Sequence, residues 1–68
     1  MNLRVNGEPR QVPSGLLLAD LVTEVNGSPV TGGVAAAVNG EVVPRSQWRE
    51  RALSEGDRIE ILGATQGG

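Results

Sequence analysis

The chain has 68 residues, with 6 basic against 8 acidic side chains, a formal net charge of −2, and neither His nor Cys. A chain of this length buries only about 60% of the surface it exposes when unfolded, so it can form one small core but no cleft between two lobes. Zinc sites of the usual kind, thiolate nucleophiles, imidazole bases and Schiff-base lysines are excluded, because every basic residue is Arg and no His or Cys is present.

The chain opens with a pattern that predicts a β-hairpin. Residues 2–6 alternate polar and apolar side chains, which places Leu3 and Val5 on one face of a half-buried strand. Asn6-Gly7 is the favoured pair for a two-residue hairpin turn, because both positions need a positive φ. The return strand is expected over residues 8–12, with Pro9 at an edge or irregular position.

A short helix is predicted next from a stripe of apolar residues at i, i+3, i+4 and i+7, namely Leu18, Leu21, Val22 and Val25. Its start is weakly marked, since Leu17 near the N-cap has no side-chain oxygen for the free N–H groups. Its end is clear, because Asn26-Gly27 suits a left-handed C-cap and Pro29 forbids continuation. Residues 28–33 are expected to form a loop.

The second half predicts another hairpin, a single helical turn and a last strand. Residues 34–38 are expected to form a strand that turns at Asn39-Gly40 and returns over residues 41–43, until Pro44 ends it. Ser46 is the expected N-cap of a turn carrying Trp48, which we expect to pack or cap rather than bind a ligand. Residues 58–62 alternate again, with Ile59 and Ile61 inward.

This order of elements predicts an α+β domain in which a mixed sheet of four to five strands packs on one helix. The last strand can pair parallel with the first after a long crossover. The domain is expected over residues 1–62, followed by a flexible tail over residues 63–68 that has no large apolar side chain. The expected core comprises Leu3, Val5, Val12, Leu18, Leu21, Val22, Val25, Val34, Ala36, Val38, one of Val42 and Val43, Leu53, Ile59 and Ile61.

Charge and hydropathy point to a cytoplasmic protein without nucleic-acid or membrane partners. Phosphate binding needs a surplus of clustered basic residues, and one Trp makes no stacking platform. The longest apolar runs, residues 16–19 and 34–38, fall far short of the roughly 20 residues of a membrane span. Asp20 lies within residues 16–22, which argues against this stretch as the hydrophobic region of a signal peptide. The chain has no Cys and therefore no disulfide, so nothing in it indicates an oxidising compartment.

Several pieces of the sequence together form a family-like pattern: LRVNG at 3–7, the helix, VNGEVVPR at 38–45 with Trp48 three residues on, LSEGDRIEI at 53–61 and the terminal Gly67-Gly68. With these pieces, nearly the whole chain resembles the ubiquitin-like sulfur carriers of thiamine biosynthesis, the ThiS family. The resemblance implies a β-grasp fold. The Val-Pro-Arg with Trp48, and the short length, favour this branch over the small subunit of molybdopterin synthase.

The resemblance implies a chemistry located at the chain terminus. A partner of the ThiF type, an E1-like adenylyltransferase, would adenylate Gly68 with ATP. Sulfur from a donor such as a cysteine desulfurase would then displace AMP and leave a thiocarboxylate, a 1-thioglycine. A thiazole synthase of the ThiG type would receive this sulfur for the thiazole ring. The chain itself would bind no cofactor or metal, would supply no catalytic residue and would not be an enzyme.

Several residues are candidates for contact with those partners. Gly67 and Gly68 would thread a narrow channel, because glycine lacks a Cβ, and Leu62 and Arg45 are candidate docking contacts. Two other functions stay open at this point. One is a carrier that serves molybdopterin synthesis, and the other is a non-covalent β-grasp binding module whose tail is incidental.

Overall fold

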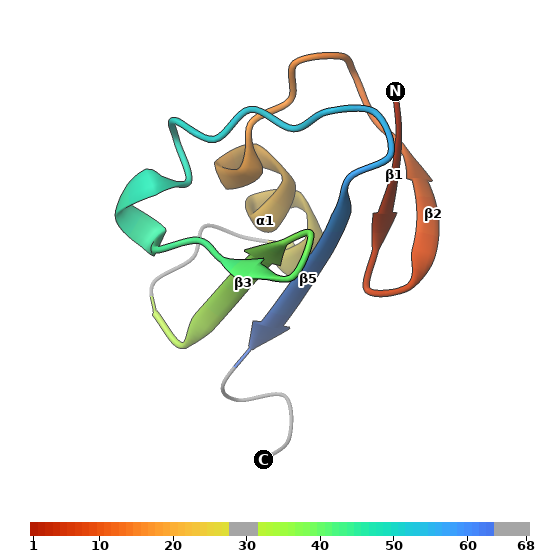
Figure 1. Cartoon of the computed structure of the whole chain (residues 1–68). Coiled ribbons are helices and arrows are strands. Elements are labelled where there is room, and N and C mark those ends of the chain that lie inside the picture. The colour runs from red at the N-terminus through yellow and green to blue at the C-terminus, as the bar shows by residue number, and fades with distance from the viewer. Residues whose placement is uncertain (28–31, 64–68) are drawn as a thin grey trace.

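The fold was analysed in a computed structural model that describes residues 1–27 and 32–63 (Figure 1). Its elements, in chain order, are β1 (Asn2–Val5), β2 (Glu8–Gln11), α1 (Leu18–Asn26), β3 (Val34–Val38), β4 (Glu41–Val42), the 3-10 helix η1 (Arg45–Gln47) and β5 (Arg58–Gly63). This is the α+β arrangement expected from the sequence. The predicted flexibility of the tail concerns residues 64–68, which lie outside the described part of the chain.

The five strands form one mixed sheet in the order β2-β1-β5-β3-β4, so the last strand in the sequence is the central one. β5 runs parallel to β1, with Val5 opposite Ile59, and antiparallel to β3, with Ala36 opposite Ile61. The hairpins β1–β2 and β3–β4 are antiparallel and flank β5. The predicted parallel pairing of the first and last strands is therefore confirmed.

Both hairpins turn at the predicted Asn-Gly pairs. Asn6 and Asn39 have φ values of 52° and 53°, and the glycines that follow have φ values of 84° and 88°. Such positive φ values at both central positions match the twist of the flanking strands and explain why Asn-Gly is used there.

The core lies between α1 and one face of the sheet (Figure 1). It contains the predicted residues except Val25 and Val34, which are half-buried and pack against it. Val43 is the inward member of its pair, whereas Val42 is exposed. Trp48 is also in the core, where its indole Nε1–H donates a hydrogen bond of 2.8 Å to the Val43 carbonyl. Its predicted packing role is confirmed.

The ends of α1 follow the predicted signals. Leu17 is the N-cap and makes no side-chain cap bond. Instead the N–H of Leu18 donates to the carbonyl of Arg51 at 2.8 Å, so a distant loop satisfies one of the free N–H groups at the start of the helix. Gly27 ends the helix in the left-handed region, with its N–H on the Thr23 carbonyl.

Several predicted details were wrong. β1 and β4 each end one residue earlier than predicted, at Val5 and Val42. Ser46 is not an N-cap: it lies inside η1, and Pro44 holds the N-cap position without a side-chain bond. β2 ends at Gln11, one residue before Val12, which is buried beyond the strand. β5 extends to Gly63, one residue into the segment expected to be tail, because Gly63 still lies opposite Val34 of β3.

Candidate functional site

The central strand β5 leads directly to the predicted reactive end of the chain. Gly63 closes β5 at the rim of the sheet, and five residues follow it in the sequence. Gly67 and Gly68, which the sequence predicts as the tail that enters a partner, lie outside the described residues. What the structure places is the strand that precedes them and the surface around its end.

That surface includes an apolar patch on the sheet face opposite α1. Because side chains alternate along a strand, Ile59 and Ile61 face the helix while Leu62 faces away from it. Among the described residues, two large hydrophobic side chains are exposed: Leu62 at 67% and Val42 at 75%. We define the outer patch as Ala35, Ala37, Val42 and Leu62.

The sheet register brings the outer patch together from three strands. Ala35 lies opposite Leu62, and Ala37 lies opposite Val42. Together with Ala36 and Glu60, these residues line a shallow hollow of about 140 Å³. The alanines form a low floor between two taller side chains, so the hollow offers van der Waals contact to an apolar side chain of a partner. Glu60 adds one negative charge at its side.

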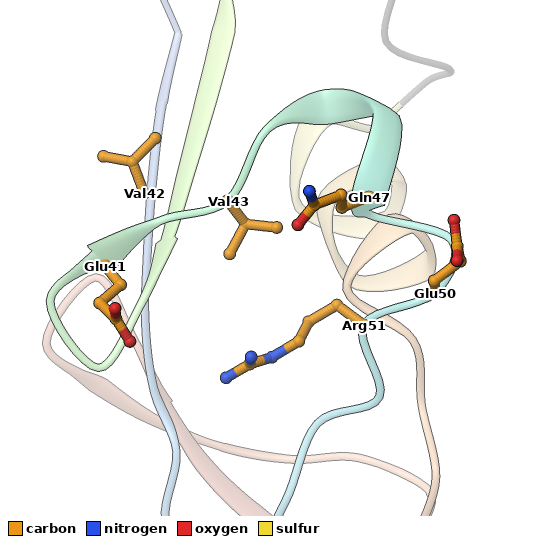
Figure 2. Close-up of a pocket in the computed structure, with 6 residues that line it drawn as sticks. All are labelled: Glu41, Val42, Val43, Gln47, Glu50 and Arg51. Atoms are coloured by element: carbon orange, nitrogen blue, oxygen red, sulfur yellow. The ribbon is translucent and has the colours of Figure 1, made fainter.

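A second, more polar hollow of about 430 Å³ lies between β4 and the segment around η1 (Figure 2). Its lining residues are Glu41, Val42, Val43, Gln47, Glu50 and Arg51. Figure 2 shows Glu41, Gln47 and Arg51 pointing toward a shared space, while Val42 points away from it. The hollow carries both signs of charge, with Glu41 and Glu50 as its acidic residues and Arg51 as its basic one.

The two predicted partner contacts are placed on different elements. Leu62 belongs to the outer patch near the end of β5. Arg45 is exposed in η1 and does not line either of these two hollows. Sequence reasoning missed Val42, Ala35 and Ala37. The signal was present, because strand alternation together with the Asn39-Gly40 turn places all three on the face of Leu62.

Over the described ranges, no group of three or more His, Cys, Asp or Glu side chains is arranged to hold a metal ion. Nor is any helix among those residues long and apolar enough to cross a membrane.

Comparison with known proteins places these features in a family. A sequence model of the ThiS family matches residues 3–68. The sulfur carrier protein ThiS of Escherichia coli strain K12 is 28% identical over 68 residues, which span the whole of both chains. A thiazole synthase of Paramagnetospirillum magneticum is 32% identical over the whole of this chain, which covers 20% of that longer protein.

Solved structures agree with the sequence match. The crystal structure of the thiamine biosynthesis protein ThiS from Geobacter metallireducens has a TM-score of 0.80 and 31% identity, with full coverage of both chains. A solution structure of a thiamine biosynthesis protein from the same organism has a TM-score of 0.77 and 32% identity, and this chain covers 88% of it. The chain belongs to the ThiS family and is a sulfur carrier protein of thiamine biosynthesis, with a β-grasp fold.

Proposed function

We propose that Gly68 is the residue that carries the sulfur, as a C-terminal thiocarboxylate. Membership in the ThiS family implies such a modification. A free carboxylate is ionised at neutral pH and resists nucleophiles, so it first needs a leaving group. The carboxylate oxygen attacks the α-phosphorus of ATP and releases pyrophosphate. Hydrosulfide, or its equivalent on a donor protein, then attacks the acyl carbon and expels AMP, so that a C–S bond replaces the C–O bond.

The observation that supports this assignment is the place of the two terminal glycines in the sequence, shortly after the central strand. The terminal Gly67-Gly68 follows the central strand β5 by only a few residues, and no side chain there hinders the acyl carbon. The described part of the chain has no His, Cys or Lys side chain, and so no side-chain imidazole, thiolate or amine that could act as a nucleophile. The catalytic groups therefore belong to the partners.

The partners we propose are a ThiF-type adenylyltransferase, a sulfur donor such as a cysteine desulfurase, and a ThiG-type thiazole synthase, all in the cytoplasm. The relative that is a thiazole synthase supports the last of these, because it contains a segment similar to the whole of this chain. We propose that Leu62 and the rest of the outer patch dock on these partners, with Arg45 as a further contact.

The test is to incubate the chain with its adenylyltransferase, ATP and inorganic sulfide, and to record its intact mass. The wild-type chain should exchange one oxygen for sulfur in an ATP-dependent way. A chain that lacks Gly68 ends in Gly67 and still has a carboxylate, but that group stops one residue short of the partner's ATP, so it should not exchange. Equal exchange in both chains, or none in the wild type, would overturn the assignment.

A further inference from the structure

We infer that Asn6 is a positioning residue for the carrier reaction: its side chain continues the β1–β5 ladder beyond the end of β1 and fixes the last part of β5, from which the reactive tail departs. This inference rests on the function proposed for Gly68. The Asn6 Oδ1 accepts a hydrogen bond of 2.8 Å from the N–H of Ile61, a residue 55 positions away in the sequence.

The geometry of the ladder explains what this bond replaces. Between the parallel strands, the N–H of Arg4 donates to the Asp57 carbonyl at 3.0 Å, and the N–H of Asn6 donates to the Ile59 carbonyl at 2.9 Å. A parallel ladder advances by two residues on each strand, so the next bond would join the N–H of Ile61 to the backbone carbonyl of Asn6. The chain turns at Asn6, and the side-chain oxygen takes the place of that carbonyl.

The position of this bond gives it a functional consequence. β1 ends at Val5, so among the described residues the Asn6 side chain is the last partner of β5 on its β1 side. Without it, residues 61–63 would be held in the sheet by β3 alone. Leu62 and Gly63 lie in this stretch. The bond therefore fixes both the docking side chain Leu62 and the point from which the tail starts.

The other hairpin supplies a matched control at the opposite end of the same strand. The Asn39 Oδ1 accepts a hydrogen bond of 2.9 Å from the N–H of Arg58, the first residue of β5, and its Nδ2 donates to Asp57. Asn39 has the same left-handed conformation as Asn6 and also precedes a glycine. The two asparagines thus hold β5 at its start and at its end, but only Asn6 holds the end that precedes the tail.

The experiment compares Asn6→Gly, Asn6→Asp and Asn39→Gly with the wild type. Glycine accepts the positive φ and keeps each turn, so Asn6→Gly loses its one side-chain bond to β5, and Asn39→Gly loses its side-chain bonds to Arg58 and Asp57. Aspartate tolerates the same conformation and keeps the acceptor oxygen. Amide hydrogen exchange of the isolated chain should accelerate at Ile61 in Asn6→Gly, and at Arg58 in Asn39→Gly. Unfolding of each variant in urea measures its loss of stability.

The functional measurement is the KM for the carrier in ATP-dependent adenylation by its partner enzyme. A hydrogen bond of ordinary net strength corresponds to roughly 2- to 13-fold in an equilibrium constant. We therefore expect the KM of Asn6→Gly to rise by about fivefold. Its kcat should change little, because the adenylation step is the same once the C-terminal residues have bound in the partner's active site. Asn6→Asp should restore the wild-type KM, and Asn39→Gly should keep it.

The outcomes separate this role from a purely structural one. Equal KM values for Asn6→Gly and Asn39→Gly, or unchanged exchange at Ile61 in Asn6→Gly, would overturn the inference. A wild-type chain that is never adenylated would instead overturn the proposed function, and with it the role of Asn6 in the reaction. The exchange at Ile61 would still report, independently, whether this side chain holds the strand.

Discussion

Leu62 provides the sharpest test of the outer patch as a docking surface. Full burial of a Leu side chain contributes about 1.5–3 kcal/mol, and Leu62 is 67% exposed in the isolated chain. About two thirds of that contribution, roughly 1–2 kcal/mol, therefore remains to be gained in a complex. Leu62→Ala should weaken binding to the adenylyltransferase by about 5- to 30-fold. Its unfolding free energy should fall by no more than about 1 kcal/mol, because little burial is lost.

The assay is titration calorimetry of each variant with the adenylyltransferase, alongside urea unfolding of the free chain. Thr23→Ala is the matched control, because Thr23 is exposed on α1, on the side of the sheet opposite the outer patch. It should bind like the wild type. Wild-type affinity for Leu62→Ala, or an equal loss in Thr23→Ala, would refute the docking argument.

Three further predictions concern stability. Trp48→Phe leaves the buried Val43 carbonyl unpaired and should lower the unfolding free energy by about 1–3 kcal/mol, measured by circular dichroism in urea; an unchanged midpoint would contradict the bond. Gly27→Ala should cost about 1–2 kcal/mol, because Gly27 has a φ of +80° while a Cβ there would meet no atom within 4 Å. Glu24→Gln should cost less than about 1 kcal/mol at low salt, and still less at high salt, because the Arg10–Glu24 ion pair is largely exposed; a larger loss would show an unexpected coupling.

Local signals made most of the fold predictable. The Asn-Gly pairs determine both turns through their positive φ, and the apolar stripe of α1 ends at a glycine suited to the left-handed C-cap. The alternation of β5 placed Ile59 and Ile61 inward and so left Leu62 outward. These features depend on a few neighbouring residues, and such residues can be interpreted without knowledge of the tertiary structure.

What the sequence did not reveal depends on residues far apart in the chain. The two turn asparagines carried no predicted function, yet both bond β5 through their side chains, one across 55 positions and the other across 19. Ser is a residue type that favours N-caps, but η1 begins at Arg45, so Ser46 lies inside it and Pro44 holds the N-cap position. The start of α1 likewise depends on the Arg51 carbonyl, which no local pattern indicates.

The most direct test of the central claim is to locate the transferred sulfur by fragmentation mass spectrometry. Arg58 is the last basic residue, so trypsin releases residues 59–68 as a single C-terminal peptide. After reaction with the adenylyltransferase, ATP and sulfide, the sulfur-for-oxygen mass difference should appear in every fragment that contains Gly68 and in none that lacks it. Sulfur on an internal residue, or a C-terminal peptide of unchanged mass, would contradict the account.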